Sequence, residues 1–178
     1  MILTGSEIKA RVASGSLVIE DFDEARLGPN SYNLRLAPEL MVYDEIVLDP
    51  KRQNRARQLT LPPEGVKLMP GRVYLAVTQE YTETHGLVPL LTGRSSLGRL
   101  GLGVHVTAGF GDIGYCGNWT LELTVQQPTM VYPGMEICQI YYLLPLGEAD
   151  REYSGKYQGA RETLPSRIHW EMGEEAQP

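Results

Sequence analysis

The strongest structural signal in the chain is the stretch Asn118-Trp119-Thr120-Leu121-Glu122-Leu123-Thr124-Val125-Gln126. Its apolar and polar residues alternate, which is the period of an extended strand whose successive side chains point to opposite faces. One face would carry Trp119, Leu121, Leu123 and Val125, and the other would carry Thr120, Glu122 and Thr124. The stretch therefore predicts a half-buried β-strand.

Shorter runs of the same kind lie elsewhere in the chain, and turn residues separate them. The 178 residues include 19 Gly and 12 Pro, which favours short strands joined by turns over long helices. Expected strand boundaries are Pro38, Pro50, Pro70-Gly71, the polar stretch after Thr78, and Pro133-Gly134. The expected strands are residues 31–36, 41–46, 72–78 and 135–144, and residues 49–65 form an irregular connection. We therefore expect a mainly β fold, a barrel or jelly roll with few helices.

The N-terminus carries the only confident helix signal in the first half of the chain. Thr4 and Glu7 have the spacing of a capping box, Ile8 and Val12 lie four residues apart, and Gly15 is a suitable stop. The sequence becomes polar and charged near its end. We expect a single domain over residues 1–178, in which residues from about 148 to 178 form a C-terminal tail.

Length and composition narrow the class of protein. A chain of this length buries about 70% of its unfolded surface, so it needs no disulfide or structural metal ion to stabilise its core. The net charge of −6 argues against a general nucleic-acid binder, which needs a basic surface. The chain has two cysteines without paired spacing, no secretion signal, and no apolar run long enough to cross a membrane. We expect a cytoplasmic protein that binds neither nucleic acid nor membranes.

One glycine motif is set aside. Gly109-x-Gly111-x-x-Gly114 matches a dinucleotide-binding fingerprint. That fingerprint needs a helix directly after it, so that the helix N-terminus can receive a pyrophosphate. Here an alternating strand follows, so the glycines are interpreted as residues of a tight turn.

A zinc-type signature is also set aside. His169-Trp170-Glu171 matches the first half of the zinc-deaminase motif, but the required Pro-Cys-x-x-Cys does not follow. The other histidines, His85 and His105, are far apart in sequence and have no acidic partner at ligand spacing. We therefore predict no metal-ligating residues and no catalytic zinc.

The stretch Gly93-Arg94-Ser95-Ser96-Leu97-Gly98-Arg99-Leu100-Gly101-Leu102 is rich in groups that bind oxyanions. If it begins a helical turn, Ser95 and Arg99 lie four apart and share a face. Backbone N–H groups, hydroxyls and Arg94 would then hold phosphate. From the pattern alone, a capped surface turn with solvated arginines is an equally good interpretation.

Several motifs together resemble the dCTP deaminases of the dUTPase-like superfamily. They are Gly-Arg-Ser-Ser-Leu-Gly-Arg-Leu-Gly at 93–101, Thr-Ala-Gly-Phe-x-Asp-x-Gly-Tyr-x-Gly at 107–117, and Thr-Leu-Glu-Leu at 120–123. Further matches are Gly-Pro-Asn-Ser-Tyr-Asn-Leu-Arg-Leu at 28–36, Tyr-Pro-Gly-Met at 132–135, and Tyr-Ser-Gly-Lys-Tyr-Gln at 153–158. The resemblance covers nearly the whole chain in the expected order, which makes it far more specific than any single motif.

The resemblance implies a homotrimer of distorted jelly-roll subunits with active sites between neighbouring chains. Glu122 would be the general acid and base, with Arg99 beside it, and Ser95 and the Ala108 carbonyl would orient the water. Asp112 would accept the sugar 3′-hydroxyl, Tyr115 would pack near the sugar, and Thr120 and Leu121 would present backbone to the base. The remaining implied nucleotide contacts are Arg94, Ser96, Leu97, Gly98, Gln139 and the tail residues Tyr153, Lys156 and Gln158.

The chemistry of the reaction agrees with the role implied for Glu122. Deamination without a metal needs a water activated to attack C4, a proton delivered to N3, and another delivered to the leaving amine. One carboxyl can move all these protons if partial burial lets it take up a proton near neutral pH. Arg99 could stabilise charge that develops in the transition state. From pattern alone, Glu122 would more often be a solvated residue of an ordinary strand.

Two positions depart from the family pattern. Asn33 stands where many relatives have Asp, and Ala160 stands where several have a second Gln. A carboxylate role therefore cannot be transferred to Asn33, and Gln158 would have to serve in place of the second Gln.

The product and the alternatives remain open at this point. Gly109 directly after Thr107-Ala108 resembles members that hydrolyse dUTP further to dUMP, which favours the bifunctional form slightly. Mg²⁺ would accompany the triphosphate, and dTTP would inhibit at the same site. A plain dUTP pyrophosphatase or a catalytically silent nucleotide-sensing module on the same scaffold are the alternatives.

Overall fold

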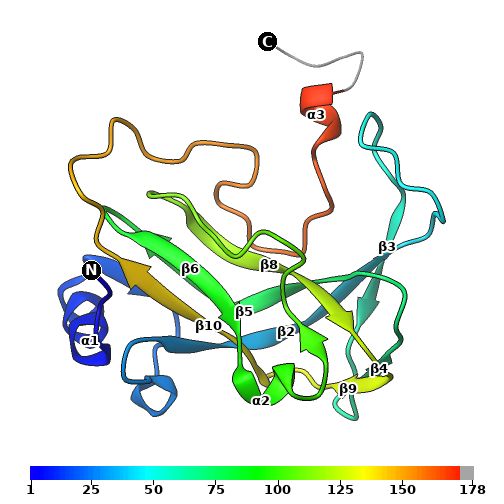
Figure 1. The fold of residues 1–178 in the computed structure, drawn as a ribbon, viewed down its shortest axis with the longest axis horizontal. Helices are drawn as coiled ribbons and strands as arrows, with labels where there is room; N and C mark the ends of the chain where they lie inside the picture. Colours follow the sequence, from blue (N-terminus) through cyan, green and yellow to red (C-terminus); the bar gives the residue numbers. More distant parts are fainter. Residues whose placement is uncertain (173–178) are drawn as a thin grey trace.

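The computed structural model describes residues 1–172 and consists mostly of antiparallel strands (Figure 1). The elements in chain order are α1 (Gly5–Ser14), β1 (Leu17–Ile19), the 3₁₀ turn η1 (Glu24–Arg26), β2 (Tyr32–Tyr43), β3 (Ala56–Thr60), β4 (Val66–Leu68), β5 (Tyr74–Thr84), β6 (Val88–Gly93), α2 (Ser95–Gly98), β7 (Leu102–Gly103), β8 (Cys116–Val125), β9 (Thr129–Val131), β10 (Glu136–Leu143) and α3 (His169–Met172). The predicted mainly β fold with few helices is confirmed.

Most strands belong to one sheet, which curves around the core. Its order is β6-β10-β2-β5-β8-β7, with β1 added to β5 and β3 added to β2, while β4 and β9 form a separate pair. All of these pairings are antiparallel. The predicted closed, jelly-roll-like arrangement agrees with this topology, because strands far apart in sequence meet in one continuous sheet.

Strand β8 follows the alternation in its sequence. Leu121 and Leu123 are fully buried, whereas Thr120, Glu122 and Thr124 are partly exposed. The strand pairs with β5 along one edge and with the short β7 near its end. Burial of alternate leucines fixes the register of the strand, since a slip by one residue would turn these side chains to the polar face.

The predicted N-terminal helix is confirmed at both ends. The Thr4 hydroxyl accepts a hydrogen bond from the Glu7 N–H at 3.4 Å, and Gly15 ends the helix at φ 76°. The reciprocal half of the capping box is absent from the hydrogen bonds of residues 1–172, because the Glu7 carboxylate accepts from Arg11 instead. The i,i+4 ion pair competes with the cap for the same carboxylate.

Two predicted strand boundaries are wrong. Pro38 does not separate two strands, because β2 runs through it from Tyr32 to Tyr43. Pro38 lies where the β2–β5 register shifts between Leu36 and Leu40, so its missing N–H costs no ladder bond, and its carbonyl accepts from Leu61. The expected irregular connection over residues 49–65 also contains a strand, β3, which pairs with β2.

The other wrong boundary is Thr78, because β5 continues to Thr84 through polar residues, of which Thr78, Glu80, Thr82 and Thr84 are buried. Residues 78–80 form a bulge opposite Trp119 of β8. The Glu80 carboxylate is fully buried, and Arg26 and Arg35 donate to its Oε1 at 3.1 and 2.6 Å. The Arg35 N–H donates to Oε2 at 2.8 Å. Partners from β2 and η1 thus compensate the burial of this charge.

We predict that Glu80→Gln strongly destabilises the fold. The buried Arg26 and the partly exposed Arg35 would then remain beside a neutral amide, and loss of one partner of a buried pair costs about 3–5 kcal/mol. Denaturant unfolding at fixed protein concentration measures the change in the free energy of unfolding. Glu24→Gln is the matched control, because Glu24 pairs with Lys9 on the surface and such a pair is worth at most about 1 kcal/mol. Equal losses in the two variants would contradict the role assigned to Glu80.

Candidate active site

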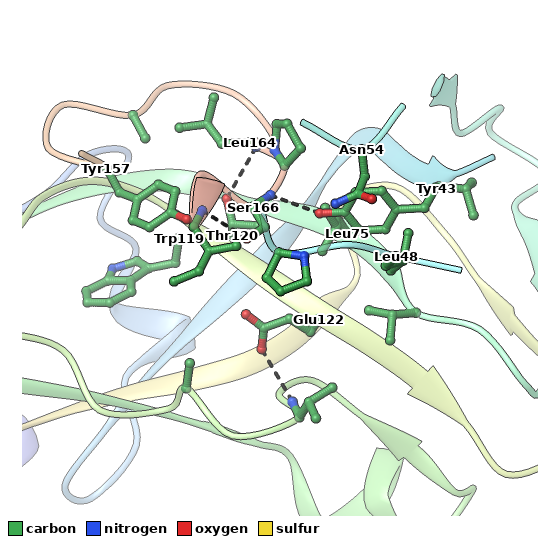
Figure 2. Close-up of a pocket in the computed structure, with 18 of the residues that line it drawn as sticks. Tyr43, Leu48, Asn54, Leu75, Trp119, Thr120, Glu122, Tyr157, Leu164 and Ser166 are labelled. Carbon is green, nitrogen blue, oxygen red and sulfur yellow. Dashed lines mark hydrogen bonds between the residues drawn. The ribbon is translucent and has the colours of Figure 1, made fainter. Parts of the chain in front are cut away.

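A cavity of about 1010 Å³ lies over the polar face of β8. The end of β2, the connection to β3 and the segment that leads to α3 form one wall (Figures 1 and 2). Residues within 71–75 and within 106–115, which precedes β8, also contribute to the lining. Six of the residues predicted for the nucleotide site line this cavity: Ala108, Asp112, Tyr115, Thr120, Glu122 and Tyr153.

Glu122 extends from β8 into this cavity (Figure 2). Its side chain is 27% exposed, and its Oε2 accepts a hydrogen bond from the Val106 N–H at 3.3 Å. His105 Nδ1 lies 3.2 Å from the same oxygen. The strand pattern therefore placed the carboxyl on the correct face, and two neighbours from the preceding loop hold it there.

The structure corrects the prediction that the histidines lack acidic partners. His105, which the sequence suggested only as a packed or hydrogen-bonded residue, is 11% exposed and contacts Glu122. His85 lies within ion-pair distance of Glu83 and Glu152. Glu83 lies only two residues before His85, whereas the contacts of His85 with Glu152 and of His105 with Glu122 join distant segments, so sequence spacing could not reveal those two.

Tyr115 and Trp119 form an aromatic wall of the cavity. Their ring centroids are 4.4 Å apart, and the Tyr153 ring lies 5.8 Å from that of Tyr115. The Tyr115 hydroxyl donates to the Asn118 carbonyl at 2.8 Å. Burial raises the pKa of Tyr115 well above its ordinary value, so the ring stays a neutral, rigid surface against which an apolar part of a ligand can pack.

The predicted phosphate-binding residues do not line this cavity. Arg94 and the turn α2 lie at the opposite end of the molecule from α3 (Figure 1). The turn itself is present, and Ser95, Ser96, Gly98 and Arg99 are exposed in it. The Leu97 and Gly98 N–H groups both donate to the Arg94 carbonyl, so these two amides are used within the turn.

Arg94 is held in place by a carboxylate. Its Nη1 lies 2.8 Å from Glu136 Oε2, and the Asn33 side-chain amide donates to the same oxygen at 3.0 Å. Gln139 accepts a hydrogen bond from Ser31 on the neighbouring β2 side of the sheet. Arg94 and Gln139 therefore belong to the α2 end of the molecule, outside the cavity.

The remaining predicted contacts face other partners. The Leu121 side chain is fully buried, so only its backbone could face a ligand. Lys156 pairs with Glu171. The Gln158 side chain donates to the Gly114 carbonyl at 2.8 Å and accepts from the Cys116 N–H at 3.0 Å. Residues 173–178 of the predicted tail lie outside the described residues.

The structure agrees with the interpretation of the glycine motif as a turn. The glycines at 109, 111 and 114 lead into β8, not into a helix, and Gly114 has φ 86°. His169 lies in α3, in the segment beside the cavity.

None of the helices in residues 1–172 is long and apolar enough to span a membrane.

Sequence reasoning missed one wall of the cavity. Tyr43 is the last residue of β2, Leu48 and Asn54 come from the β2–β3 connection, and Leu164 and Ser166 come from the tail (Figure 2). Hydrogen bonds join the tail to the rest of the cavity, from the Ser166 N–H to the Tyr43 hydroxyl at 2.9 Å and from the Leu164 N–H to the Thr120 hydroxyl at 3.5 Å. No periodic pattern marks these residues.

Comparison with known proteins places this geometry in a family. The family model for dCTP deaminase-like proteins matches residues 2–143. A protein of Cytophaga hutchinsonii named "dCTP deaminase, dUMP-forming" is 55% identical over 169 residues, which are 95% of this chain and 97% of that protein. A protein of Hathewaya histolytica with the same name is 54% identical over 168 residues, 94% of this chain and 97% of the relative.

A solved structure supports the fold independently. The crystal structure of 2′-deoxycytidine 5′-triphosphate deaminase from Agrobacterium tumefaciens aligns with a TM-score of 0.63 and 25% identity, over 79% of this chain and 47% of that chain. The predicted dUTPase-like jelly roll is thereby confirmed as the fold shared with a dCTP deaminase. Sequence match, identity and fold agree, and the chain belongs to the dCTP deaminase-like family.

Proposed function

We propose that this protein is an enzyme that hydrolytically deaminates dCTP and carries the product through to dUMP, releasing ammonia and pyrophosphate. The observation that carries the proposal is Glu122, a partly buried carboxyl at the floor of a cavity in a chain that is 55% identical to a relative named as a dUMP-forming dCTP deaminase.

Glu122 would move the protons of the deamination. Within the described residues both of its hydrogen bonds end on Oε2, which leaves Oε1 to accept a proton as the water attacks C4. The protonated carboxyl then gives this proton to N3. It next takes the remaining proton from the new C4 hydroxyl and delivers it to the amine, so that the C4–N bond breaks, ammonia leaves and a C4 carbonyl forms. The Ala108 carbonyl, on the cavity wall, and the Ser95 hydroxyl would orient the water.

The lining favours a mechanism that uses this carboxyl without zinc. The described lining residues include neither His nor Cys, whereas a zinc deaminase binds its ion through these two residue types. Arg99 would stabilise negative charge on the transition state.

The nucleoside would lie between Asp112 and the aromatic wall. Asp112 would accept the 3′-hydroxyl of the sugar, and Tyr115 would pack beside the ring. The backbone of Thr120 and Leu121 would face the edge of the base. The position of Asp112, Tyr115 and Thr120 in one cavity supports this assignment.

The triphosphate would be bound by a neighbouring chain in a homotrimer. Arg94 is partly exposed, Ser95, Ser96, Gly98 and Arg99 are exposed, and all of them are distant from the cavity of their own chain. In a closed three-fold ring, one surface of each chain meets a different surface of the next, so α2 of one chain can complete the cavity of its neighbour. Gln139 would join this phosphate site, and Tyr153, Lys156 and Gln158 of the tail would close over it.

Mg²⁺ would enter with the triphosphate and neutralise its charge. The α2 end offers arginines and hydroxyls, and its carboxylate Glu136 is already paired with Arg94. Mg²⁺ often keeps several waters and binds substrate phosphates directly, so phosphate oxygens and water would supply its ligands. We also propose that dTTP inhibits the enzyme at the same site. The protein would be located in the cytoplasm, where its two free cysteines would stay reduced.

The product test uses purified protein, dCTP and Mg²⁺ with zinc chelated, and follows dUTP, dUMP, pyrophosphate and ammonia over time. Ammonia with dUMP and pyrophosphate supports the bifunctional enzyme, whereas ammonia with dUTP alone would limit it to deamination. Without ammonia the proposal fails. The same assay with dUTP would then distinguish a dUTP pyrophosphatase from a silent nucleotide-binding module.

We predict that Glu122→Gln lowers the rate of ammonia release by at least about 10²-fold, because the amide cannot shuttle protons. Binding of dCTP, measured by calorimetry, should change little, since the amide keeps the size of the side chain. Glu148→Gln is the control, because Glu148 is exposed and outside the cavity. Substantial turnover by Glu122→Gln would remove Glu122 from its assigned role.

The division of the site between chains gives a second prediction. Arg99→Ala and Glu122→Gln trimers should each be inactive, but co-expression of the two variants should restore activity. At equal amounts, about a quarter of the sites would combine an intact α2 with an intact Glu122. Native mass spectrometry verifies that mixed trimers have formed. Mixed trimers no more active than either parent would show that each site lies within one chain.

A further inference from the structure

A second cluster of reactive side chains lies outside the cavity, where β5 ends and β8 begins. Glu83 and Cys116 are direct partners in the antiparallel pairing of these strands, so their side chains lie on the same face of the sheet. His85 follows Glu83 by two residues and returns to that face. The fold therefore brings a carboxylate, an imidazole and a thiol together from two strands.

The ligand atoms of the three side chains converge. One oxygen of Glu83, one ring nitrogen of His85 and the sulfur of Cys116 all lie within 4.8 Å of one another. His85 Nε2 is 3.5 Å from Glu83 Oε2. Zinc binds oxygen, nitrogen and sulfur ligands at about 2.0–2.3 Å, so small side-chain rotations would bring all three atoms to one ion.

Neighbouring groups hold each of these side chains in place. The Tyr81 hydroxyl donates to Glu83 Oε1 at 3.0 Å, which leaves Oε2 for an ion. Glu152 Oε2 lies 3.6 Å from His85 Nδ1, the nitrogen that faces away from Glu83. The Cys116 thiol donates to the Gly114 carbonyl at 3.5 Å, and the Cys116 N–H donates to Gln158. A carboxylate behind a ligating histidine is the usual outer contact of metal sites, because it orients the ring and raises its basicity.

We propose that Glu83, His85 and Cys116 bind a divalent transition-metal ion of the zinc class, with water as the fourth ligand and Glu152 behind His85. Sulfur and nitrogen ligands favour zinc over Mg²⁺ or Ca²⁺, which prefer oxygen. None of these four residues lines the active-site cavity, so the site is separate from the proposed deamination chemistry and does not depend on it.

The ion would fasten the start of the tail to the sheet. Glu152 immediately precedes Tyr153, and Gln158 contacts both Gly114 and Cys116. Cys116 also follows Tyr115, which belongs to the aromatic wall of the cavity. A bound ion would therefore limit the motion of the segment that crosses the cavity, and chelation would loosen it.

The experiment is a Co²⁺ titration of the full chain after chelator treatment, followed by competition with Zn²⁺. A thiolate-to-cobalt charge-transfer band that saturates at one ion per chain is expected, and Zn²⁺ should abolish it. Cys116→Ser and His85→Ala should remove the band, and Glu152→Gln should weaken affinity about 10–100-fold. His169→Ala is the control and should leave the titration unchanged, because His169 lies in α3.

A measurement on the unaltered protein guards against variants that fail to fold. Zn²⁺ should slow alkylation of Cys116, while the fully buried Cys138 should not react in the folded chain. Absence of the cobalt band together with unprotected Cys116 would overturn the site and leave His85 as an ordinary ion-pair partner of Glu83 and Glu152. A band that persists in both Cys116→Ser and His85→Ala would also overturn it. Neither readout uses dCTP, so failure here would not bear on the proposed deamination.

Discussion

The buried carboxylate of Glu80 is the interaction on which the rest of the structure depends. A charge without solvent contact is tolerated only if its partners are in place, and Arg26 and Arg35 supply them from η1 and β2. Glu80 thus fixes the bulge of β5 at residues 78–80. The bulge frees the Thr78 and Gln79 carbonyls for the Asn118 side chain, and Trp119 donates its N–H to the Thr78 hydroxyl. The aromatic wall of the cavity is built on these bonds, about 40 residues away in sequence from the bulge.

Sequence patterns correctly predicted the helices and strands whose conformation is determined by residues close to one another in the sequence. The alternation at residues 118–126 placed β8 and the orientation of Glu122, and Thr4 and Gly15 placed both ends of α1. The prediction failed where distant partners decide the conformation. The strand ends predicted at Pro38 and Thr78 are wrong for this reason. The irregularity at Pro38 forms only where β2 pairs with β5, and the buried carboxylate of Glu80, just after Thr78, requires two arginines from other elements. Neither requirement is visible in a short window of sequence.

The residues of the candidate site likewise divide into those that a local pattern places and those that only distant contacts place. Glu122 could be placed on a polar strand face by pattern, but its significance came from the resemblance to a family, since an isolated carboxyl on a strand is usually solvated. His105 was not recognised as a neighbour of Glu122, because the contact joins a loop to a strand 17 residues later. The wall formed by Tyr43 and Ser166 joins residues 123 positions apart, and only the closed sheet brings them together.

The tail has a further consequence at the edge of the sheet. The Gly159 N–H donates to the Cys116 carbonyl, and the Asn118 N–H donates to the Ala160 carbonyl. The tail therefore satisfies backbone groups of β8 that face away from β5, as an additional strand would. An uncovered strand edge is a template for pairing with another molecule. Separation of residues 159–160 from β8 would uncover this edge, so the tail also protects the sheet against edge-to-edge aggregation.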